Sequence, residues 1–450
     1  MNAIPTPNPN HPAGQAGKEP GQPPGPDSGG PMTGAEKIIA RACGLPVVRP
    51  GDIGFPTPDM AMIHDNVLPA VKRALDELGI DRLAEPDKVV MVTDHEVLYG
   101  SPRAAMYGVV NRKAAKAWRV ARFFDVGRGG HGHVFPMECG MVRPGMFYFD
   151  NDRHCTNAGA IGAVGFRVGI EISRVLATGT TWIMVPHTLK LTLRGKLAAG
   201  VHARDLGIHI GALVRSGRLP FDLDYRVLEL AGDLDQFSLA ARVALCSTPT
   251  ELGAYGVFIP PSEAVLAHAR SVAQAPFEAQ FPDAGARYEA EAELDVSTLE
   301  PQISLPGGVQ QAVNISKVVG QPVQHAFVGS CASSMYEDIA AAAAFLKGRR
   351  IADGVRLFVV PGSEQTNQRL AADGLLQVFI EAGAVVLPPG CGPCNDAVVG
   401  PLDSGEVSIS TATNNNHGRF GAKDARLFLG SPETVAASAV TGCITDPRTF

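Results

Sequence analysis

The spacing of apolar residues predicts a helix early in the chain. Ile38 and Ala42 lie four residues apart, a spacing that places side chains on one face of a helix. Thr33, followed three residues later by Glu36, forms a capping-box pattern, and Gly44 is a typical helix stop. We therefore expect a helix that begins after Thr33 and ends at Gly44.

Short apolar runs that lead into small or polar residues recur along the rest of the chain. Residues 87–97, 145–155, 325–334 and 355–363 each read as a buried strand with such an ending, and residues 288–307 read as a strand followed by a crossover. Strands that alternate with helices indicate α/β layers with mostly parallel sheets. Ligands gather at the carboxyl ends of strands in such sheets, and the chemically interesting motifs of this chain fall at such ends.

Length indicates the number of domains, and composition indicates one segment that we expect to lack structure. A chain of 450 residues with 45% hydrophobic and 19% charged residues is typical of a globular protein of two or three domains. Residues 1–32 are rich in Pro and Gly and almost lack aliphatic side chains. Such a segment buries too little apolar surface to offset its ordering entropy, so we expect disorder there.

Charge and hydropathy exclude several classes of protein. The net charge of −6 offers no basic excess for nucleic acid or an anionic membrane. No uninterrupted apolar run is long enough for a transmembrane helix, and no signal peptide pattern opens the chain. Eight cysteines without a short secreted framework fit a reducing compartment, so we expect a cytoplasmic protein.

Three cysteines form the strongest candidate for a metal site. Cys331 lies in GSCASS, and Cys391 and Cys394 lie in PGCGPC. Three thiolates are one short of the four that normally close an iron–sulfur cluster, which leaves one iron position open for chemistry. A zinc site completed by a histidine, or a disulfide within the Cys-x-x-Cys pair, are the alternatives. The other cysteines are expected to pack as small hydrophobic residues: Cys43, Cys139, Cys155, Cys246 and Cys443.

The loop around Cys331 leads into a predicted helix. Ser334 and Glu337 have the spacing of a helix cap. A thiolate at this place would lie near the positive end of the helix dipole, so we expect a lowered pKa for Cys331.

Several ordered motifs resemble the aconitase superfamily, and most closely the large subunits of isopropylmalate isomerase, homoaconitase and related two-subunit hydro-lyases. They are MTGAEKIIARACG, GSCASSMYEDIAAAAAFLKGR, AGAVVLPPGCGPC, SGEVSISTATNNNHGRFG and SPETVAASAVTGCITDPR, and the resemblance runs from residue 32 to the C-terminus. It implies three α/β domains, at 33–198, 199–315 and 316–450, around a central 4Fe–4S cluster. Cys331, Cys391 and Cys394 would hold that cluster and leave one iron open.

The resemblance also implies roles for acid–base and substrate residues. Asp94 and His95 match a pair that delivers a proton to the leaving hydroxyl, and His133 matches an imidazole that pairs with an acidic residue beside the cluster. Asp152 and His154 match a further pair, and Glu229 a carboxylate that holds a histidine. The implied substrate contacts are His64, in a weaker motif, and Arg419. The remaining histidines have no such support: His131, His187, His202, His209, His268, His325 and His417.

Three positions depart from the pattern that the resemblance implies. The usual Asp-Ser-His-Thr is Asp152-Arg153-His154-Cys155, the usual Asn-Arg-Asn-Phe is residues 413–416 (Thr-Asn-Asn-Asn), and a usual Asn is Ser247. In one interpretation Arg153 replaces the positive charge lost from the 413–416 loop and binds substrate. In the other the site has degenerated. We favour a working enzyme with an altered substrate, because the proposed acid–base pair and all three cysteines are present.

The resemblance further implies a partner and a reaction. The family's swivelling domain, which carries the catalytic serine base, does not follow residue 450, so a separate small subunit is expected. The implied reaction is dehydration of a hydroxy di- or tricarboxylic acid, by default of the 3-isopropylmalate type. Maleate, citraconate or dimethylmalate-type substrates are alternatives. An inactive subunit and an RNA-binding apoprotein are further alternatives, the latter disfavoured by the lack of a basic groove.

Overall fold

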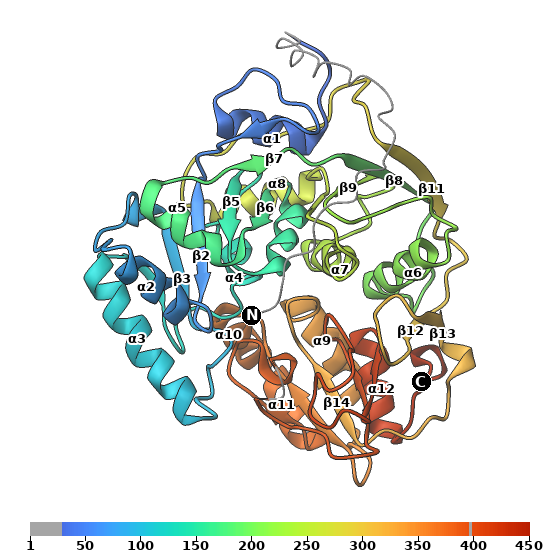
Figure 1. Cartoon of the computed structure of the whole chain (residues 1–450). Coiled ribbons are helices and arrows are strands. Elements are labelled where there is room, and N and C mark those ends of the chain that lie inside the picture. Colours follow the sequence, from blue (N-terminus) through green and yellow to red (C-terminus); the bar gives the residue numbers. More distant parts are fainter. Residues whose placement is uncertain (1–28, 396–397) are drawn as a thin grey trace, which may run out of the picture.

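Three sheets with flanking helices make up the chain in the computed structural model, which describes residues 29–395 and 398–450 (Figure 1). Of the residues 1–32 for which disorder is predicted, 1–28 lie outside the described residues, whereas 29–32 are described and the Met32 N–H donates to Asp283 Oδ2 at 2.9 Å. The predicted α/β class with mostly parallel sheets is confirmed, because only the pairs β1–β7, β12–β13 and β12–β18 run antiparallel among the described strands.

The first helix begins and ends as the sequence predicts. Helix α1 spans Gly34–Cys43. The backbone N–H of Glu36 donates to Thr33 Oγ1 at 3.2 Å, and the N–H of Thr33 donates to Glu36 Oε2 at 2.9 Å. Gly44 takes the left-handed conformation (φ 65°), which glycine adopts without a steric penalty.

The first sheet is five-stranded and fully parallel, in the order β4-β3-β2-β5-β6. Its strands are β2 (Met60–His64), β3 (Val89–Val92), β4 (Arg122–Phe124), β5 (Phe147–Asp150) and β6 (Val164–Arg167). Its helices are α2 (Leu68–Glu77), α3 (Pro102–Trp118), α4 (Phe135–Glu138) and α5 (Ile172–Thr178). A two-stranded sheet of β1 (Ile53–Gly54) and β7 (Ile183–Met184) lies apart from it.

The second sheet is four-stranded and parallel, in the order β10-β9-β8-β11. Its strands are β8 (Thr188–Arg194), β9 (Val227–Gly232), β10 (Gly256–Phe258) and β11 (Ala290–Asp295). Its helices are α6 (Ala203–Arg215), α7 (Leu239–Thr250) and α8 (Glu263–Val272). Because β8 belongs here, the sheet begins before the predicted domain boundary at residue 198.

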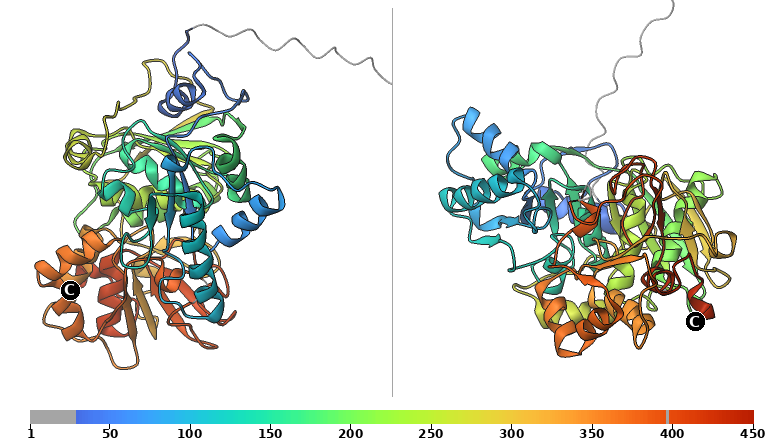
Figure 2. Two further views of the ribbon diagram at one scale, coloured as in Figure 1. Left: turned by 90° about the vertical axis from the view of Figure 1, so that its left-hand side faces the viewer. Right: turned by 90° about the horizontal axis from the view of Figure 1, so that it is seen from below.

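The third sheet is seven-stranded, in the order β13-β12-β18-β17-β14-β15-β16. Its strands are β12 (Gln302–Ser304), β13 (Ala312–Asn314), β14 (His325–Val328), β15 (Arg356–Val359), β16 (Val385–Val386), β17 (Val407–Ser410) and β18 (Arg426–Leu429). Its helices are α9 (Tyr336–Leu346), α10 (Glu364–Ala372), α11 (Leu375–Ala382) and α12 (Pro432–Thr441). This part lies below the other two in the left view of Figure 2. Strands β12 and β13 join it, although they precede the predicted boundary at residue 315.

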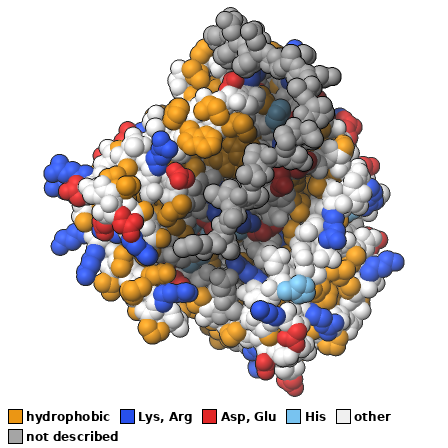
Figure 3. Space-filling model, viewed as in Figure 1, with side chains coloured by type: hydrophobic (Ala, Val, Ile, Leu, Met, Phe, Trp, Pro, Cys, Tyr) orange, Lys and Arg blue, Asp and Glu red, His pale blue; other side chains and the backbone are white. Residues whose placement is uncertain are grey.

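The surface carries no long stretch of one charge on the face shown in Figure 3, where Lys and Arg side chains lie among Asp and Glu side chains. Among the described helices, none combines the length and the apolar character needed to cross a membrane.

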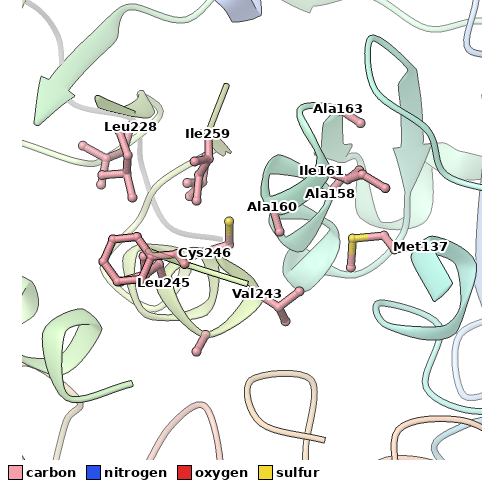
Figure 4. Packing of buried hydrophobic residues seen from close by; sticks show 14 of the residues in the cluster. Met137, Ala158, Ala160, Ile161, Ala163, Leu228, Val243, Leu245, Cys246 and Ile259 are labelled. Atoms are coloured by element: carbon pink, nitrogen blue, oxygen red, sulfur yellow. The ribbon is translucent and has the colours of Figure 1, made fainter. Parts of the chain in front are cut away.

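One hydrophobic core joins the first and second sheets. It contains Met62 of β2 as well as Leu191 of β8. Figure 4 shows Val243 and Cys246 of α7 lying between Leu228 on one side and Ala160 on the other. Cys246 is fully buried in this core, which confirms its predicted packing role. The first two sheets therefore hold each other in place, and residues at their strand ends are fixed relative to one another.

Candidate active site

Three neighbouring strands of the first sheet end at one place. Strands β3, β2 and β5 are adjacent and parallel, so their carboxyl ends share one edge. His64 is the last residue of β2 and Asp150 the last of β5, while Asp94 follows β3 by two residues. The sequence-based expectation that candidate residues gather at strand ends is confirmed for these three strands.

A series of imidazole and carboxylate groups begins at His95. Its Nδ1 lies 2.7 Å from Asp94 Oδ1. The other oxygen of Asp94 lies 2.9 Å from Nδ1 of His64, and Nε2 of His64 lies 3.3 Å from Asp150 Oδ1. His64, Asp94 and Asp150 are fully buried, whereas the side chain of His95 keeps 12% of its surface exposed. His95 is therefore one of the two partly exposed parts of the series; the other is at Asp152 and His154, whose side chains are 31% and 14% exposed.

The series continues from Asp150 to the second sheet. Asp150 Oδ2 lies 3.6 Å from His133 Nδ1, and His133 Nε2 lies 3.2 Å from Asp152 Oδ1. Asp152 Oδ1 is also 3.1 Å from His154 Nδ1, and His154 Nε2 is 2.9 Å from Glu251 Oε1. Imidazoles and carboxylates thus alternate without a break from His95 to Glu251, so each ring is oriented by its acidic neighbours.

The carboxylates keep most of these imidazoles charged. Burial alone would lower the pKa of His64 and of His95, but Asp94 and Asp150 raise that of His64, and Cys391 followed by Asp94 raises that of His95, well above the usual value. Burial likewise favours a protonated Asp94, yet the two imidazoles hold its pKa well below the usual range. The pair Asp94–His95 is therefore a carboxylate beside an imidazolium, which is the state of a proton donor.

The pKa values in the second half of the series, with one exception, are shifted in the same directions. Burial opposes a charge on His154, but Asp152 and Glu251 raise its pKa to about 9. The pKa of Asp152 lies well below its usual range because His133 and His154 outweigh its burial. His133 is the exception, because burial and then the charge of His64 lower its pKa.

The loop that carries two of the cysteines docks directly on the Asp94–His95 pair. The N–H of Cys391 donates to the Asp94 carbonyl at 2.8 Å, and Asn395 Nδ2 donates to the His95 carbonyl at 2.9 Å. A Cβ at Gly390 would lie 2.7 Å from the Asp94 carbonyl, so the approach requires glycine. The cysteine loop and the acid–base pair are therefore one packed unit.

All three candidate cluster cysteines are buried, with side chains that influence one another electrostatically. Burial, followed by the neighbouring thiols, raises the pKa of Cys331 well above the usual value, and burial raises that of Cys391 to about 12. These buried thiols resist ionisation in the absence of a metal. When a metal binds such a group, the thiols release their protons and become its ligands. Buried thiols are the ligand type that an iron–sulfur cluster takes, so the chemistry of these residues fits such a group.

Two predictions about the Cys331 loop are wrong. Helix α9 is capped by Asp338, whose Oδ2 accepts from the N–H of Met335 at 3.2 Å, and Ser334 Oγ makes no hydrogen bond within the described part of the chain. Cys331 precedes the first helical residue, Tyr336, by more than a turn. Burial of the thiol consequently outweighs the helix dipole, and the pKa of Cys331 is raised rather than lowered.

Glu229 does not hold a histidine. Its carboxylate accepts from the Tyr288 hydroxyl at 2.6 Å and from the N–H of Gly34 at 3.1 Å, and burial raises its pKa to about 7. Besides the nearby Asp152, the carboxylate bonded to His154 within the described residues is Glu251, which follows the last residue of α7. The predicted role of Glu229 is therefore corrected in favour of Glu251.

His64 also differs from the prediction of a substrate contact. It is fully buried, and each ring nitrogen lies within 3.3 Å of a carboxylate oxygen. A ring so enclosed holds Asp94 and Asp150 in place rather than meeting a substrate.

The positions that depart from the family pattern have distinct environments. The Arg153 side chain is 54% exposed, and its Nη1 is 3.8 Å from Glu251 Oε2. Asn414 Nδ2 also reaches Glu251 Oε1, at 3.5 Å. Arg419 is partly buried, and its backbone N–H donates to the Asn416 carbonyl at 3.1 Å.

The hydroxyl of Ser247 donates to the side-chain carbonyl of Asn157 at 3.0 Å. Asn157 in turn donates to the Cys331 carbonyl at 2.9 Å. The amide missing from position 247 is thus supplied beside Cys331 by Asn157.

Sequence reasoning missed several residues of the site. Asp150 and Glu251 complete the imidazole–carboxylate series, and His131 Nε2 lies 3.4 Å from Cys391 Sγ. Asp65, which adjoins His64 in the weaker motif and so was not missed, accepts the backbone N–H groups of His95 and Glu96 at 3.1 and 2.9 Å. Asp150 had a sequence signal, a charged residue at the end of an apolar strand, but the others depend on contacts between distant segments.

Comparison with known proteins agrees with this geometry. The family described as "Aconitase family (aconitate hydratase)" matches residues 49–324 and 316–442. The chain belongs to the aconitase family. It is 37% identical over 421 residues to the 3-isopropylmalate dehydratase large subunit 1 of Methanopyrus kandleri, a match that covers 93% of this chain and 99% of that protein. It is 36% identical to the homoaconitase large subunit of Thermus thermophilus, with 93% and 97% covered.

A further relative and one solved structure complete the comparison. The 3-isopropylmalate dehydratase large subunit of Herpetosiphon aurantiacus is 37% identical, with 93% of this aconitase-family chain and 97% of that protein covered. The holo-form of Thermococcus kodakaraensis aconitase X superposes with a TM-score of 0.48 at 11% identity, covering 82% of this chain and 87% of that one. Family membership rests on the sequence matches, and it makes the chain a hydro-lyase of the dehydratase type.

The alternative of a disulfide is not what the structure has. All eight cysteines are free thiols, Cys391 and Cys394 included. The five outside the candidate cluster site are wholly or partly buried, as expected of packing residues.

Proposed function

We propose that this chain is the large subunit of an iron–sulfur hydro-lyase that dehydrates a hydroxy diacid of the 3-isopropylmalate type. The observation that carries the proposal is the direct docking of the Cys391 loop on Asp94 and His95. A proton donor and a metal-ligand set in backbone contact are what elimination of a hydroxyl requires.

Cys331, Cys391 and Cys394 would hold a 4Fe–4S cluster with one open iron. When bound, such a group acts as a Lewis acid toward the substrate hydroxyl and an adjacent carboxylate. The chain's own contribution is to bury the thiols and to position them: Asn157 fixes the Cys331 carbonyl, and Asp94 fixes the N–H of Cys391.

His95 is the proton donor to the departing hydroxyl. Its Nδ1 is held by Asp94, and its ring also contacts the Cys391 side chain, which places the proton donor beside the proposed cluster. Its raised pKa keeps it protonated at neutral pH, and its partial exposure admits the substrate. His64 and Asp65 act as positioning residues, since they fix the Asp94 carboxylate and the His95 backbone.

Arg153 binds a substrate carboxylate. Its guanidinium is largely exposed and lies beside Asp152 and His154 along the chain, with Glu251 as a distant partner. A planar guanidinium suits bidentate binding of a carboxylate. Arg419 is proposed as a second carboxylate contact. Arg153 lies on a different loop from the arginine that residues 413–416 have lost, so the geometry of substrate binding changes. Maleate, citraconate and dimethylmalate-type acids therefore belong in any substrate test.

A small swivel-domain subunit carrying a catalytic serine is proposed as the partner. The curated relatives are named as large subunits, and this chain spans 97–99% of their length. The proton alpha to the carboxylate would be taken by that subunit's serine, so the chain alone is expected to be nearly inactive. We also propose a cytoplasmic location, because the cluster thiols require a reducing compartment.

The test is a substrate panel with the anaerobically purified complex of both subunits. Formation of the unsaturated acid is followed by ultraviolet absorbance for 3-isopropylmalate, homocitrate, malate, citramalate and dimethylmalate. Dehydration of one of these, lost on His95→Gln, supports the proposal. A complex that holds its cluster but dehydrates no member of the panel would contradict it and favour an inactive subunit.

A further inference from the structure

Two arginine side chains are fully buried, and they differ in how their charge is satisfied. Arg242, on α7, has a carbonyl for each nitrogen: Nε donates to Phe237 at 3.2 Å, Nη1 to Pro260 at 2.9 Å and Nη2 to Leu234 at 3.3 Å. A guanidinium in this setting has a structural role, because each of its three nitrogens donates to a backbone carbonyl.

Arg204, the second residue of α6, is not satisfied in this way. One of its terminal nitrogens donates to the Ala412 carbonyl, while Nε and Nη1 have no hydrogen-bond partner within the part of the chain that the structure describes. The adjacent Asp205 is not its partner, since that carboxylate accepts from the backbone N–H groups of His202 and Gln302 at 2.8 and 3.0 Å. A buried charge with unpaired donors is costly unless an opposite charge faces it.

The segment that Arg204 holds lies between the cluster cysteines. Thr413 Oγ1, one residue beyond Ala412, is 4.0 Å from Cys394 Sγ. On the other side, the Thr411 carbonyl accepts from the hydroxyl of Ser330 at 3.0 Å, and Ser330 directly precedes Cys331. The guanidinium is therefore anchored to the loop that packs against the cluster site.

The packing around Arg204 points to the thiol site as its counter-charge, because the 411–413 segment that it holds contacts Ser330 on one side and Cys394 on the other. Burial lowers the pKa of Arg204 to about 10, and the groups that favour its charge are, in order of size, Cys331, Glu251 and Cys394, with Asp205 after them. Glu251 already binds His154, and Asp205 is engaged by backbone donors. The unpaired donors of Arg204 and the thiols of Cys331 and Cys394 therefore belong to one buried site.

We propose that Arg204 is the buried counter-charge of the cluster site, with its free N–H groups directed toward the sulfur atoms of the thiolates and of the bound cluster. This inference rests on the proposed cluster. Hydrogen bonds and positive charge near the sulfurs favour the more negative, reduced cluster and slow its loss. Arg204 is therefore a positioning residue for the cluster, whereas Arg153 serves the substrate.

The test uses the two-subunit holoenzyme with Arg204→Met, Arg204→Lys and, as a matched control, Arg242→Met. Iron and sulfide content, iron release to a chelator, and an EPR-monitored titration with dithionite are measured for each. Arg204→Met is expected to release iron roughly tenfold faster, as for loss of one charged hydrogen bond, and to be reduced at a lower potential. Arg204→Lys keeps the charge and lies nearer the wild type, while Arg242→Met is less stable but keeps the wild-type potential.

Several results would overturn the inference. A potential and iron-release rate in Arg204→Met equal to those of Arg242→Met would show that burial alone matters. An unchanged cluster with a raised KM would assign Arg204 to the substrate instead. If Arg204→Met fails to fold, Arg204→Gln, which removes the charge, is compared with Arg204→Lys, which keeps it. A wild-type reduction potential of the cluster in Arg204→Gln, together with an altered potential in Arg204→Lys, would reject the role of charge. A wild-type protein without iron would instead refute the proposed function itself.

Discussion

Replacement of Glu251 by glutamine is expected to lower the pKa of His154, whereas the same replacement of Glu229 is not. Glu251 Oε1 lies 2.9 Å from His154 Nε2, and the other ring nitrogen faces Asp152 at 3.1 Å. Glu229, also buried, bonds to Tyr288 and to the N–H of Gly34 instead. The two glutamates therefore form a matched pair that differs in contact with the histidine.

The magnitude follows from the two carboxylates around His154. Together they raise its pKa from 6.5 to about 9 against the effect of burial. An opposite charge within hydrogen-bonding distance changes a pKa by roughly one to three. Removal of one of two such charges in Glu251→Gln should lower the pKa of His154 by about one to two. Each pKa unit corresponds to ~1.4 kcal/mol, so the loss of stability is on the order of 2 kcal/mol.

The direction with pH follows from proton binding. Because the folded pKa of His154 is the higher one, its stabilisation is fully present below pH 6.5 and is lost as the pH rises toward about 9. In Glu251→Gln the pKa of His154 is lower, so its stabilisation is lost over a smaller range of pH above 6.5. The free energy of unfolding of the variant should therefore fall less between pH 6.5 and 9 than that of the wild type.

The assay is NMR titration of the full chain with labelled histidine, in which the His154 signal is assigned by its absence from His154→Gln. Urea unfolding across the same pH range gives the stability difference. Unchanged His154 titration in Glu251→Gln, or an equal decrease in Glu229→Gln, would refute the assignment of Glu251 as the carboxylate that holds His154.

Three further predictions concern the cluster, the substrate and the core. Cys331→Ser should lose most of the iron that the wild type binds, while Cys246→Ser keeps it; equal iron in both variants would contradict the ligand assignment. Arg153→Gln should raise KM for the hydroxy diacid at least about tenfold with a smaller change in kcat, as for loss of a charged contact, and an unchanged KM would exclude a substrate contact. Phe147→Ala removes a fully buried ring of β5 and should lower the free energy of unfolding by ~3–5 kcal/mol in urea titration; a loss under 1 kcal/mol would be inconsistent with that packing.

Local patterns predicted much of the fold. The cap of α1 and the buried strands β3, β5 and β14 depend on residues close together in the chain, and they occur where the sequence places them. The edge at which Asp94 and His154 gather was also predictable, since neighbouring parallel strands end together.

Contacts between distant segments were not predictable in the same way. Glu229 was proposed because it matches a family position, but its carboxylate bonds to Tyr288 and Gly34. Glu251 lies at a helix end and meets His154 only through the packing of α7 on residues 153–161. Strand β8 pairs with β11 across nearly a hundred residues, so no local signal marks which sheet it joins. The isolation of Arg204 likewise depends on burial, which a sequence does not display.

The central claim is that Cys331, Cys391 and Cys394 hold an iron–sulfur cluster beside the Asp94–His95 pair. Iron, sulfide and zinc analysis of the anaerobically purified two-subunit complex, with EPR spectra before and after addition of 3-isopropylmalate, tests it most directly. The account predicts about four iron and four sulfide per large chain, the stoichiometry of a 4Fe–4S cluster, and a spectrum that changes with substrate. A protein that binds zinc in place of iron, or that holds no metal under these conditions, would contradict it.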